Sequence, residues 1–213
     1  MHIYYLPITS DFTPADTALI PFVSDRRQAQ IARYPQDKSK KLSLYAALLA
    51  QMILSQMTGI AVSQLRFSVT QNKKPVFLND TSILFNLSHT DGGILCGFSL
   101  TSPVGVDIEA IRKPHPGVIR KTFHPAEQNY WNTQNTDIAF VEIWTRKEAY
   151  TKMLGTGIAC ELTKINTLSD ELSADLKTWR EDSFICSACG DLSEFQKTEI
   201  TAMDIRQFYS SLQ

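Results

Sequence analysis

Two long predicted helices that end on the same short motif constrain the fold of this chain more than any other feature. Residues 42–57 are apolar around most of a helix and lead to Thr58-Gly59-Ile60, where the glycine can end the helix. About half a chain later, residues 137–154 lead to Thr156-Gly157-Ile158. A strand and a polar helix precede each long helix, so the same order of elements occurs twice.

One repeat of this length predicts a duplicated unit rather than a solenoid. We therefore expect an α+β fold made of two pseudo-symmetric lobes of about 100 residues, each a small sheet packed against a long helix. The first lobe would comprise residues 1–103 and the second residues 104–213. Residues 161–213 carry no motif, and we expect them to supply the remaining strands of the second lobe. The cleft between two such lobes is a favoured place for a ligand.

The most informative short motif is Gly105–Glu109, which reads Gly-Val-Asp-Ile-Glu. Its β-branched residues predict a strand in which Val106 and Ile108 face the core. Asp107 and Glu109 then share the opposite face, where two carboxylates repel each other unless a cation lies between them. Oxygen ligands of this kind suit Mg²⁺. Taken alone, the pair also fits a solvated polar face at a sheet edge.

The second long helix carries polar residues at helical spacing. Glu148 and Lys152 are four residues apart and share one face, with Trp144 one turn earlier. An ordinary surface ion pair would explain this spacing by itself. Ser88 and His89 stand at the end of another predicted strand, where an imidazole can bind phosphate or simply form a hydrogen bond.

Basic residues gather between residues 25 and 41, where only two acidic residues oppose them. This stretch fits a phosphate-rich small molecule, and it also fits the solvated face of a helix. Over the whole chain, 21 basic residues nearly balance 22 acidic ones. The overall charge therefore predicts no nucleic acid or other polyanion as a partner.

Together these motifs resemble the 4'-phosphopantetheinyl transferase superfamily, in particular its two-lobed Sfp type. The matching segments follow the family's order and spacing, and they are Lys74-Pro75, Phe85–His89, Gly105–Glu109, Phe123–Glu127 and Trp144–Gly157. The D-x-E motif is weak alone, but the motif W-x-x-K-E-x-x-x-K-x-x-G-x-G further along the chain makes the match specific. Lys73 stands where the family often has glycine, so the choice between Lys73 and Lys74 stays open.

The resemblance implies that coenzyme A binds between the lobes and donates its phosphopantetheine arm to a serine of an apo acyl or peptidyl carrier protein, releasing adenosine 3',5'-bisphosphate. The implied ligands of Mg²⁺ or Mn²⁺ are Asp107, Glu109 and Glu148. The implied catalytic residues are Asp107, Glu148 and Lys152, and Glu148 would take the serine proton directly or through a metal-bound water. The implied phosphate ligands are Lys74, Ser88, His89 and Lys152, with Arg26, Lys40 and Lys41 as candidates for the 3'-phosphate.

Two other functions stay open at this point. The chain could be a Mg²⁺-dependent hydrolase of a pyrophosphate bond in a coenzyme A-like nucleotide, or a homologue that binds coenzyme A without turnover. A pure binding protein has no need of Asp107, Glu109, Glu148 and Lys152 together, which disfavours the second alternative. The chain has neither a P-loop nor a Rossmann glycine motif, so the common nucleotide enzymes are excluded.

The expected cellular location follows from two sequence patterns that are missing, a membrane-spanning segment and a signal peptide. No segment approaches the ~20 apolar residues that span a bilayer, and the N-terminus has no signal-peptide pattern, so we expect a cytoplasmic protein without a membrane partner. The resemblance implies a monomer. Cys186 and Cys189 have C-x-x-C spacing but no second pair to complete a zinc site. We expect all four cysteines to be reduced core residues.

Overall fold

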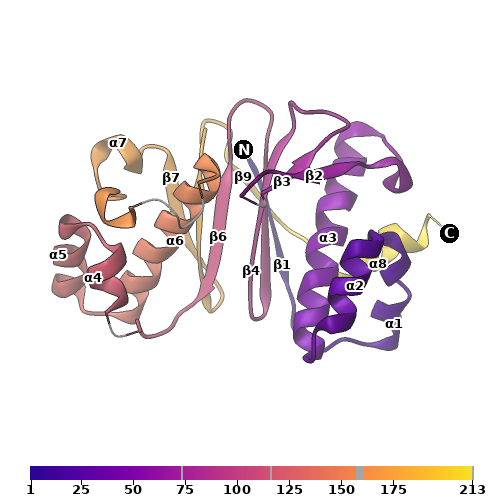
Figure 1. Ribbon diagram of the computed structural model, residues 1–213, viewed down its shortest axis with the longest axis horizontal. Helices are drawn as coiled ribbons and strands as arrows, with labels where there is room; N and C mark the ends of the chain where they lie inside the picture. Colours follow the sequence, from indigo (N-terminus) through magenta and orange to yellow (C-terminus); the bar gives the residue numbers. More distant parts are fainter. Residues whose placement is uncertain (73, 116, 157–160, 213) are drawn as a thin grey trace.

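The computed structural model describes residues 1–72, 74–115, 117–156 and 161–212, which form a mixed α+β fold (Figure 1). The elements of the first half, residues 1–103, are β1 (His2–Pro7), α1 (Pro14–Thr17), the 3₁₀ turn η1 (Ile20–Phe22), α2 (Asp25–Arg33), α3 (Asp37–Thr58), η2 (Val62–Gln64), β2 (Phe67–Val69), β3 (Pro75–Phe77), β4 (Leu84–Thr90) and β5 (Gly93–Ser99). The elements of the second half are β6 (Gly105–Ala110), α4 (Val118–Thr122), α5 (Pro125–Gln134), α6 (Asp137–Leu154), η4 (Leu162–Lys164), α7 (Asp170–Ser173), β7 (Leu176–Glu181), β8 (Phe184–Cys189), β9 (Gln196–Glu199) and α8 (Ala202–Ser210).

Two sheets form the centre of the molecule, and helices cover them on both outer sides (Figure 1). The larger sheet has the strand order β4-β5-β1-β9, and the smaller has the order β6-β8-β7. Strands β2 and β3 form a separate two-stranded antiparallel sheet. Among the described residues, no helix is long and apolar enough to cross a membrane.

Alternation of side chains along β5 explains how the layers pack. Ile94 and Phe98 belong to the apolar cluster around α3, whereas Leu95 belongs to a cluster shared with the smaller sheet. Successive side chains of a strand point to opposite faces, so the larger sheet contacts α3 with one face and the smaller sheet with the other. Ile143 of α6 and Ile185 of β8 share a further cluster, which places α6 on the outer face of the smaller sheet.

Both long helices lie where the sequence predicts them. α3 ends on Gly59, with φ of +71°, and α6 ends on Gly155, with φ of +72°. This left-handed conformation costs glycine little, because glycine has no Cβ atom. Gly157 and Ile158, which belong to the predicted end motif of the second helix, lie outside the described residues.

The C-terminal segment corrects one expectation. Residues 161–213 do supply β7 and β8 to the smaller sheet, but β9 runs parallel to β1 in the larger one. α8 then packs on α3, where the Tyr209 hydroxyl donates a hydrogen bond of 2.9 Å to the Leu48 carbonyl. The physical reason is that α3 needs cover for its apolar surface, and Ile205 and Tyr209 of α8 join the cluster around it.

Candidate active site

Gly105 determines how closely β6 can approach α6. A Cβ atom at this position would lie 1.9 Å from the Ala149 carbonyl oxygen and 2.4 Å from the Met153 amide nitrogen, so a larger residue cannot fit without a shift. The strand therefore lies directly on the helix. This close approach brings the polar residues of β6 to the polar face of the last turns of α6.

Asp107 is the most enclosed polar group of the site, at 3 % exposure. Its Oδ1 atom accepts hydrogen bonds from Ser88 Oγ at 2.8 Å and from Lys152 Nζ at 2.5 Å. Lys152 also donates to Ser88 Oγ at 2.9 Å, so the three groups form a triangle. The second carboxylate oxygen, Oδ2, is buried and has no hydrogen-bond partner among the described residues. A buried carboxylate that is satisfied on one side only can accept a further ligand.

Three carboxylates lie close enough to repel one another. Burial raises the pKa of Asp107, and the Lys152 ammonium opposes the shift. Burial and then the Asp107 charge raise the pKa of Glu109, which accepts a hydrogen bond of 3.3 Å from the Trp144 indole. Burial and then Asp107 raise the pKa of Glu148 as well. The site thus carries more negative charge than Lys152 can compensate.

A divalent cation fits this excess of negative charge. Among the described residues, no group of three or more His, Cys, Asp or Glu side chains is arranged so that it could by itself hold a metal ion. Mg²⁺, however, usually takes only one or two protein carboxylates and completes its shell with water and substrate phosphate. The unsatisfied Asp107 Oδ2 and the mutual repulsion of the carboxylates match a cation bound in that way.

His89 and Arg27 of the first half lie near each other, and His89 also lies near Lys152. The His89 side chain is exposed at the end of β4, and its pKa is lowered by desolvation and then by the charges of Lys152 and Arg27. Arg27 Nη1 also donates to Ser43 Oγ at 3.3 Å. The sequence analysis named Arg26 as a candidate and did not single out Arg27. Helical spacing could have drawn attention to Arg27, because it precedes the buried Ile31 by four residues and so shares its inward face.

The predicted N-terminal phosphate ligands lie in three different environments. Arg26 is exposed on α2. Lys40 forms an ion pair of 2.7 Å with Asp37 on the same helix. Lys41, by contrast, is 1 % exposed, and its ammonium donates to Ser10 Oγ at 2.7 Å and lies 3.4 Å from Asp16. We therefore correct the assignment of Lys41, because its charge compensates a buried carboxylate.

Lys74 also differs from its predicted role. Its ammonium donates to the main-chain carbonyls of Val104, Lys152 and Met153. An ammonium has three N–H donors, so these bonds leave no donor for a phosphate. Lys73, the alternative, lies outside the described residues. A cavity of ≈ 350 Å³ adjoins Lys74 between the β2–β3 hairpin and the end of α6.

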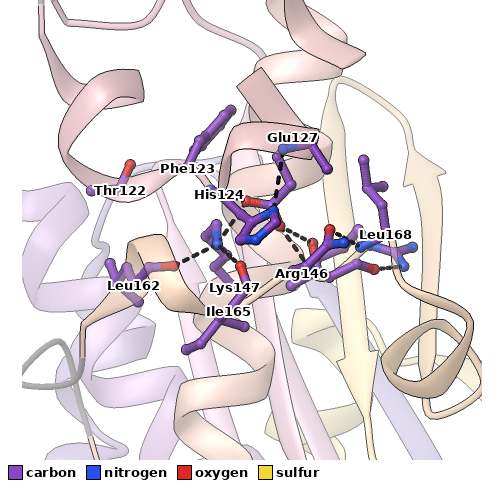
Figure 2. A network of polar contacts seen from close by, with 12 residues as sticks. Thr122, Phe123, His124, Glu127, Arg146, Lys147, Leu162, Ile165 and Leu168 are labelled. Atoms are coloured by element: carbon purple, nitrogen blue, oxygen red, sulfur yellow. Dashed lines mark hydrogen bonds and ion pairs between the residues drawn. The ribbon is translucent and has the colours of Figure 1, made fainter. Parts of the chain in front are cut away.

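A buried ion pair supports α6 next to the site (Figure 2). Lys147 directly precedes Glu148, and its ammonium lies 2.7 Å from the carboxylate of Glu127 on α5, both side chains being almost fully buried. Lys147 also donates to the Ile165 carbonyl, and Thr167 donates to Glu127, so the pair ties residues 162–167 to both helices. A buried pair is tolerated when its remaining hydrogen-bonding groups are satisfied in this way.

The described cysteines agree with reduced core residues. Cys96, Cys186 and Cys189 are buried and free of disulfides. Burial raises the pKa of Cys189 to about 12, and it also raises the pKa values of the other two thiols. Cys160 lies outside the described residues.

Comparison with known proteins shows the family of the chain. The sequence model of the 4'-phosphopantetheinyl transferase superfamily matches residues 103–203. A second model, 4'-phosphopantetheinyl transferase, N-terminal, matches residues 7–96. The two matches cover most of the chain and include every carboxylate of the site.

Three curated relatives are similar over most of this chain. The 4'-phosphopantetheinyl transferase gsp of Aneurinibacillus migulanus is 34 % identical over 64 % of this chain, and the match spans only 57 % of that relative. The transferase psf-1 of Bacillus pumilus is 32 % identical over 75 % of this chain and 70 % of its own length. Sfp of Bacillus subtilis is 24 % identical over 66 % of this chain and 64 % of its own length. The chain therefore belongs to the 4'-phosphopantetheinyl transferase superfamily.

Proposed function

We propose that the chain transfers the 4'-phosphopantetheine arm of coenzyme A to a serine hydroxyl of an apo carrier protein. Coenzyme A as the donor, and a carrier protein as the acceptor, follow from the family. The observation that carries the proposal is the triangle of Asp107, Lys152 and Ser88, with a free carboxylate oxygen and two further carboxylates beside it. Phosphoryl transfer needs such charge compensation and alignment more than covalent help from the protein.

The three carboxylates of Asp107, Glu109 and Glu148 would hold Mg²⁺ or Mn²⁺. When bound, such an ion supplies positive charge that draws electrons from the phosphate oxygens of the substrate. The support for this assignment is the closeness of the three groups, because burial and then the charge of Asp107 raise the pKa values of Glu109 and Glu148.

The residues of the chain then have distinct roles in the reaction. The serine oxygen forms a bond to the phosphorus that carries pantetheine, and the P–O bond to adenosine 3',5'-bisphosphate breaks. Glu148 takes the serine proton, for which its raised pKa is favourable. The negative charge that grows on the leaving phosphate faces the Lys152 ammonium.

Ser88, His89 and Arg27 of the first half would bind and orient the phosphates of coenzyme A, with Arg26 and Lys40 further out. Ser88 lies on β4, whereas its partners Asp107 and Lys152 lie on β6 and α6. Coenzyme A would thus bridge two lobes, divided near residue 103 and related by the pseudo-symmetry that the repeat predicts. The cytoplasmic location and the monomeric state stay predictions from the sequence.

The test is to incubate the protein with coenzyme A, Mg²⁺ and an apo carrier protein and to measure the intact mass of the carrier. We expect the mass of one phosphopantetheine group to be added, and EDTA to prevent the addition. Asp107→Asn should abolish the addition and keep the fold. Asp91→Asn, which changes an exposed partner of Lys38, should leave both the addition and the fold unchanged. Cleavage of coenzyme A with an unmodified carrier would instead indicate a hydrolase, and binding without cleavage would indicate a non-catalytic homologue.

A further inference from the structure

The last turn of α6 holds a residue of the site and is only weakly hydrogen-bonded at its end, where the Lys152 carbonyl accepts a long bond of 3.3 Å from the Gly155 amide. Lys152 lies in this turn, and the helix ends two residues later at Leu154. The final carbonyl groups of a helix have no partner within the helix, and they carry the negative end of its dipole. The position of the Lys152 ammonium therefore depends on what satisfies these carbonyls.

Lys74 supplies the missing donors from the β2–β3 hairpin. Its Nζ atom lies 2.7 Å from the Lys152 carbonyl oxygen and 3.2 Å from that of Met153. A third bond, also of 3.2 Å, reaches the Val104 carbonyl just before β6. All three donors of the ammonium are thus used on main-chain oxygens. A cation at this end of a helix is also favoured by the dipole.

A second residue of the same hairpin makes a parallel contact. Asn72 Nδ2 donates to the carbonyl of Gly155 at 2.7 Å, directly after the end of α6. The hairpin belongs to the first half of the chain, and α6 belongs to the second. Lys152 is therefore held at its carbonyl by Lys74, while its ammonium binds Asp107 at 2.5 Å.

We propose that Lys74 is a positioning residue, which holds the carbonyl end of α6 and thereby fixes Lys152 against Asp107. This assigns Lys74 to the helix end rather than to a phosphate of coenzyme A. The consequence for catalysis depends on the proposed transferase function, because only there does Lys152 act on the substrate. The contact itself does not depend on that function.

Steady-state kinetics of Lys74→Met separates the two roles. A positioning role predicts that kcat falls about tenfold while the KM for coenzyme A changes less than twofold, since small misplacement of a catalytic group slows the chemical step. Lys38→Met is the matched control, because Lys38 is exposed and forms an ion pair with the exposed Asp91, and the kcat of this variant should not change. Lys74→Arg keeps a cation with several donors and should recover most of kcat. A rise in KM with an unchanged kcat would assign Lys74 to the substrate and overturn the proposal.

Hydrogen exchange measures the contact without any need for turnover. We expect the amides of residues 148–155 to exchange several-fold faster in Lys74→Met than in the wild type or in Lys38→Met. Unchanged exchange would overturn the proposal, whatever the kinetics show. If the wild type shows no transfer at all, the proposed function fails, and exchange still decides whether Lys74 holds the helix. Should Lys74→Met not fold, Asn72→Ala removes the parallel contact from an exposed position and must raise exchange at the same helix end.

Discussion

Arg26 and Arg27 are neighbours in sequence, yet α2 turns them to different surroundings. Arg26 is exposed, whereas Arg27 is half-buried and its charge lowers the pKa of His89. We predict that Arg27→Met raises the KM for coenzyme A about tenfold, since a hydrogen bond to a charged group contributes about 1.5 kcal/mol. Arg26→Met is the matched control and should change the KM less than twofold. Steady-state kinetics with varied coenzyme A concentration measures both values. A large rise of the KM in Arg26→Met and a small one in Arg27→Met would show that Arg26 is the ligand.

At the scale of single residues, the sequence predicts the acidic part of the site better than the basic part. Asp107 and Glu109 alternate along a strand, and Glu148 and Lys152 share a helix face, so local spacing places each pair on one face. The close contact of β6 with α6 then brings the two pairs together. Lys41 and Lys74 carry the positive charge expected of a residue that binds phosphate. Lys41 instead lies against a buried carboxylate, and Lys74 binds the end of a helix. Charge in a sequence does not reveal which internal group it compensates.

At the scale of elements, the contact between β6 and α6 determines the site. We predict that Gly105→Ala lowers the free energy of unfolding by about 1–3 kcal/mol, because the added Cβ must push strand and helix apart. The same shift should lower kcat. Gly59→Ala is the comparison, since nothing lies within 4 Å of a Cβ there and only the positive φ is strained. It should cost about 1 kcal/mol and leave kcat unchanged. Urea unfolding and single-turnover rates of both variants would check this, and an unchanged rate in Gly105→Ala would contradict it.

The elements also differ in how well the sequence predicts them. α3 and α6 are long, α3 is apolar around most of its surface, and each helix ends near a glycine, so their positions follow from local pattern. β9 is four exposed residues with no apolar alternation, and its partner β1 lies at the other end of the chain. Such pairing depends on the completed sheet and on the packing of α8 over the apolar surface of α3. A short segment of sequence reveals neither of these.

At the scale of the whole molecule, Asp16 ties the beginning of the chain to its end. Tyr45 and Arg206 donate to its Oδ1 atom at 2.6 and 2.8 Å, so the carboxylate joins α1, α3 and α8. Burial alone would raise the pKa of Asp16, but hydrogen bonds from Tyr45, Arg206 and Thr13 outweigh it and lower the pKa to about 2.

The sign of the pH dependence follows from this lowered pKa. We predict that Asp16 contributes stability above pH ~4, and that on the order of 2 kcal/mol is lost as the pH falls from about 4 to about 2. Urea unfolding across this range should show a weaker loss in Asp16→Asn, which is less stable already at neutral pH. Asp25→Asn changes an exposed acid and should keep the wild-type slope. Equal slopes in all three proteins would contradict the assignment.

The return of β9 and α8 to the first half makes the two halves unfold together. The larger sheet needs a strand from the C-terminal segment, and the two sheets share a core. If coenzyme A also bridges the halves, it should stabilise this single unit by mass action, by about 2.7 kcal/mol at a hundredfold excess over Kd. We therefore predict one thermal transition that moves upward with coenzyme A and Mg²⁺. Dephospho-coenzyme A should give a smaller shift, and the difference between the two ligands should shrink in Arg27→Met if Arg27 binds the 3'-phosphate. Two separate transitions, with only one responding to the ligand, would contradict a site built from both halves.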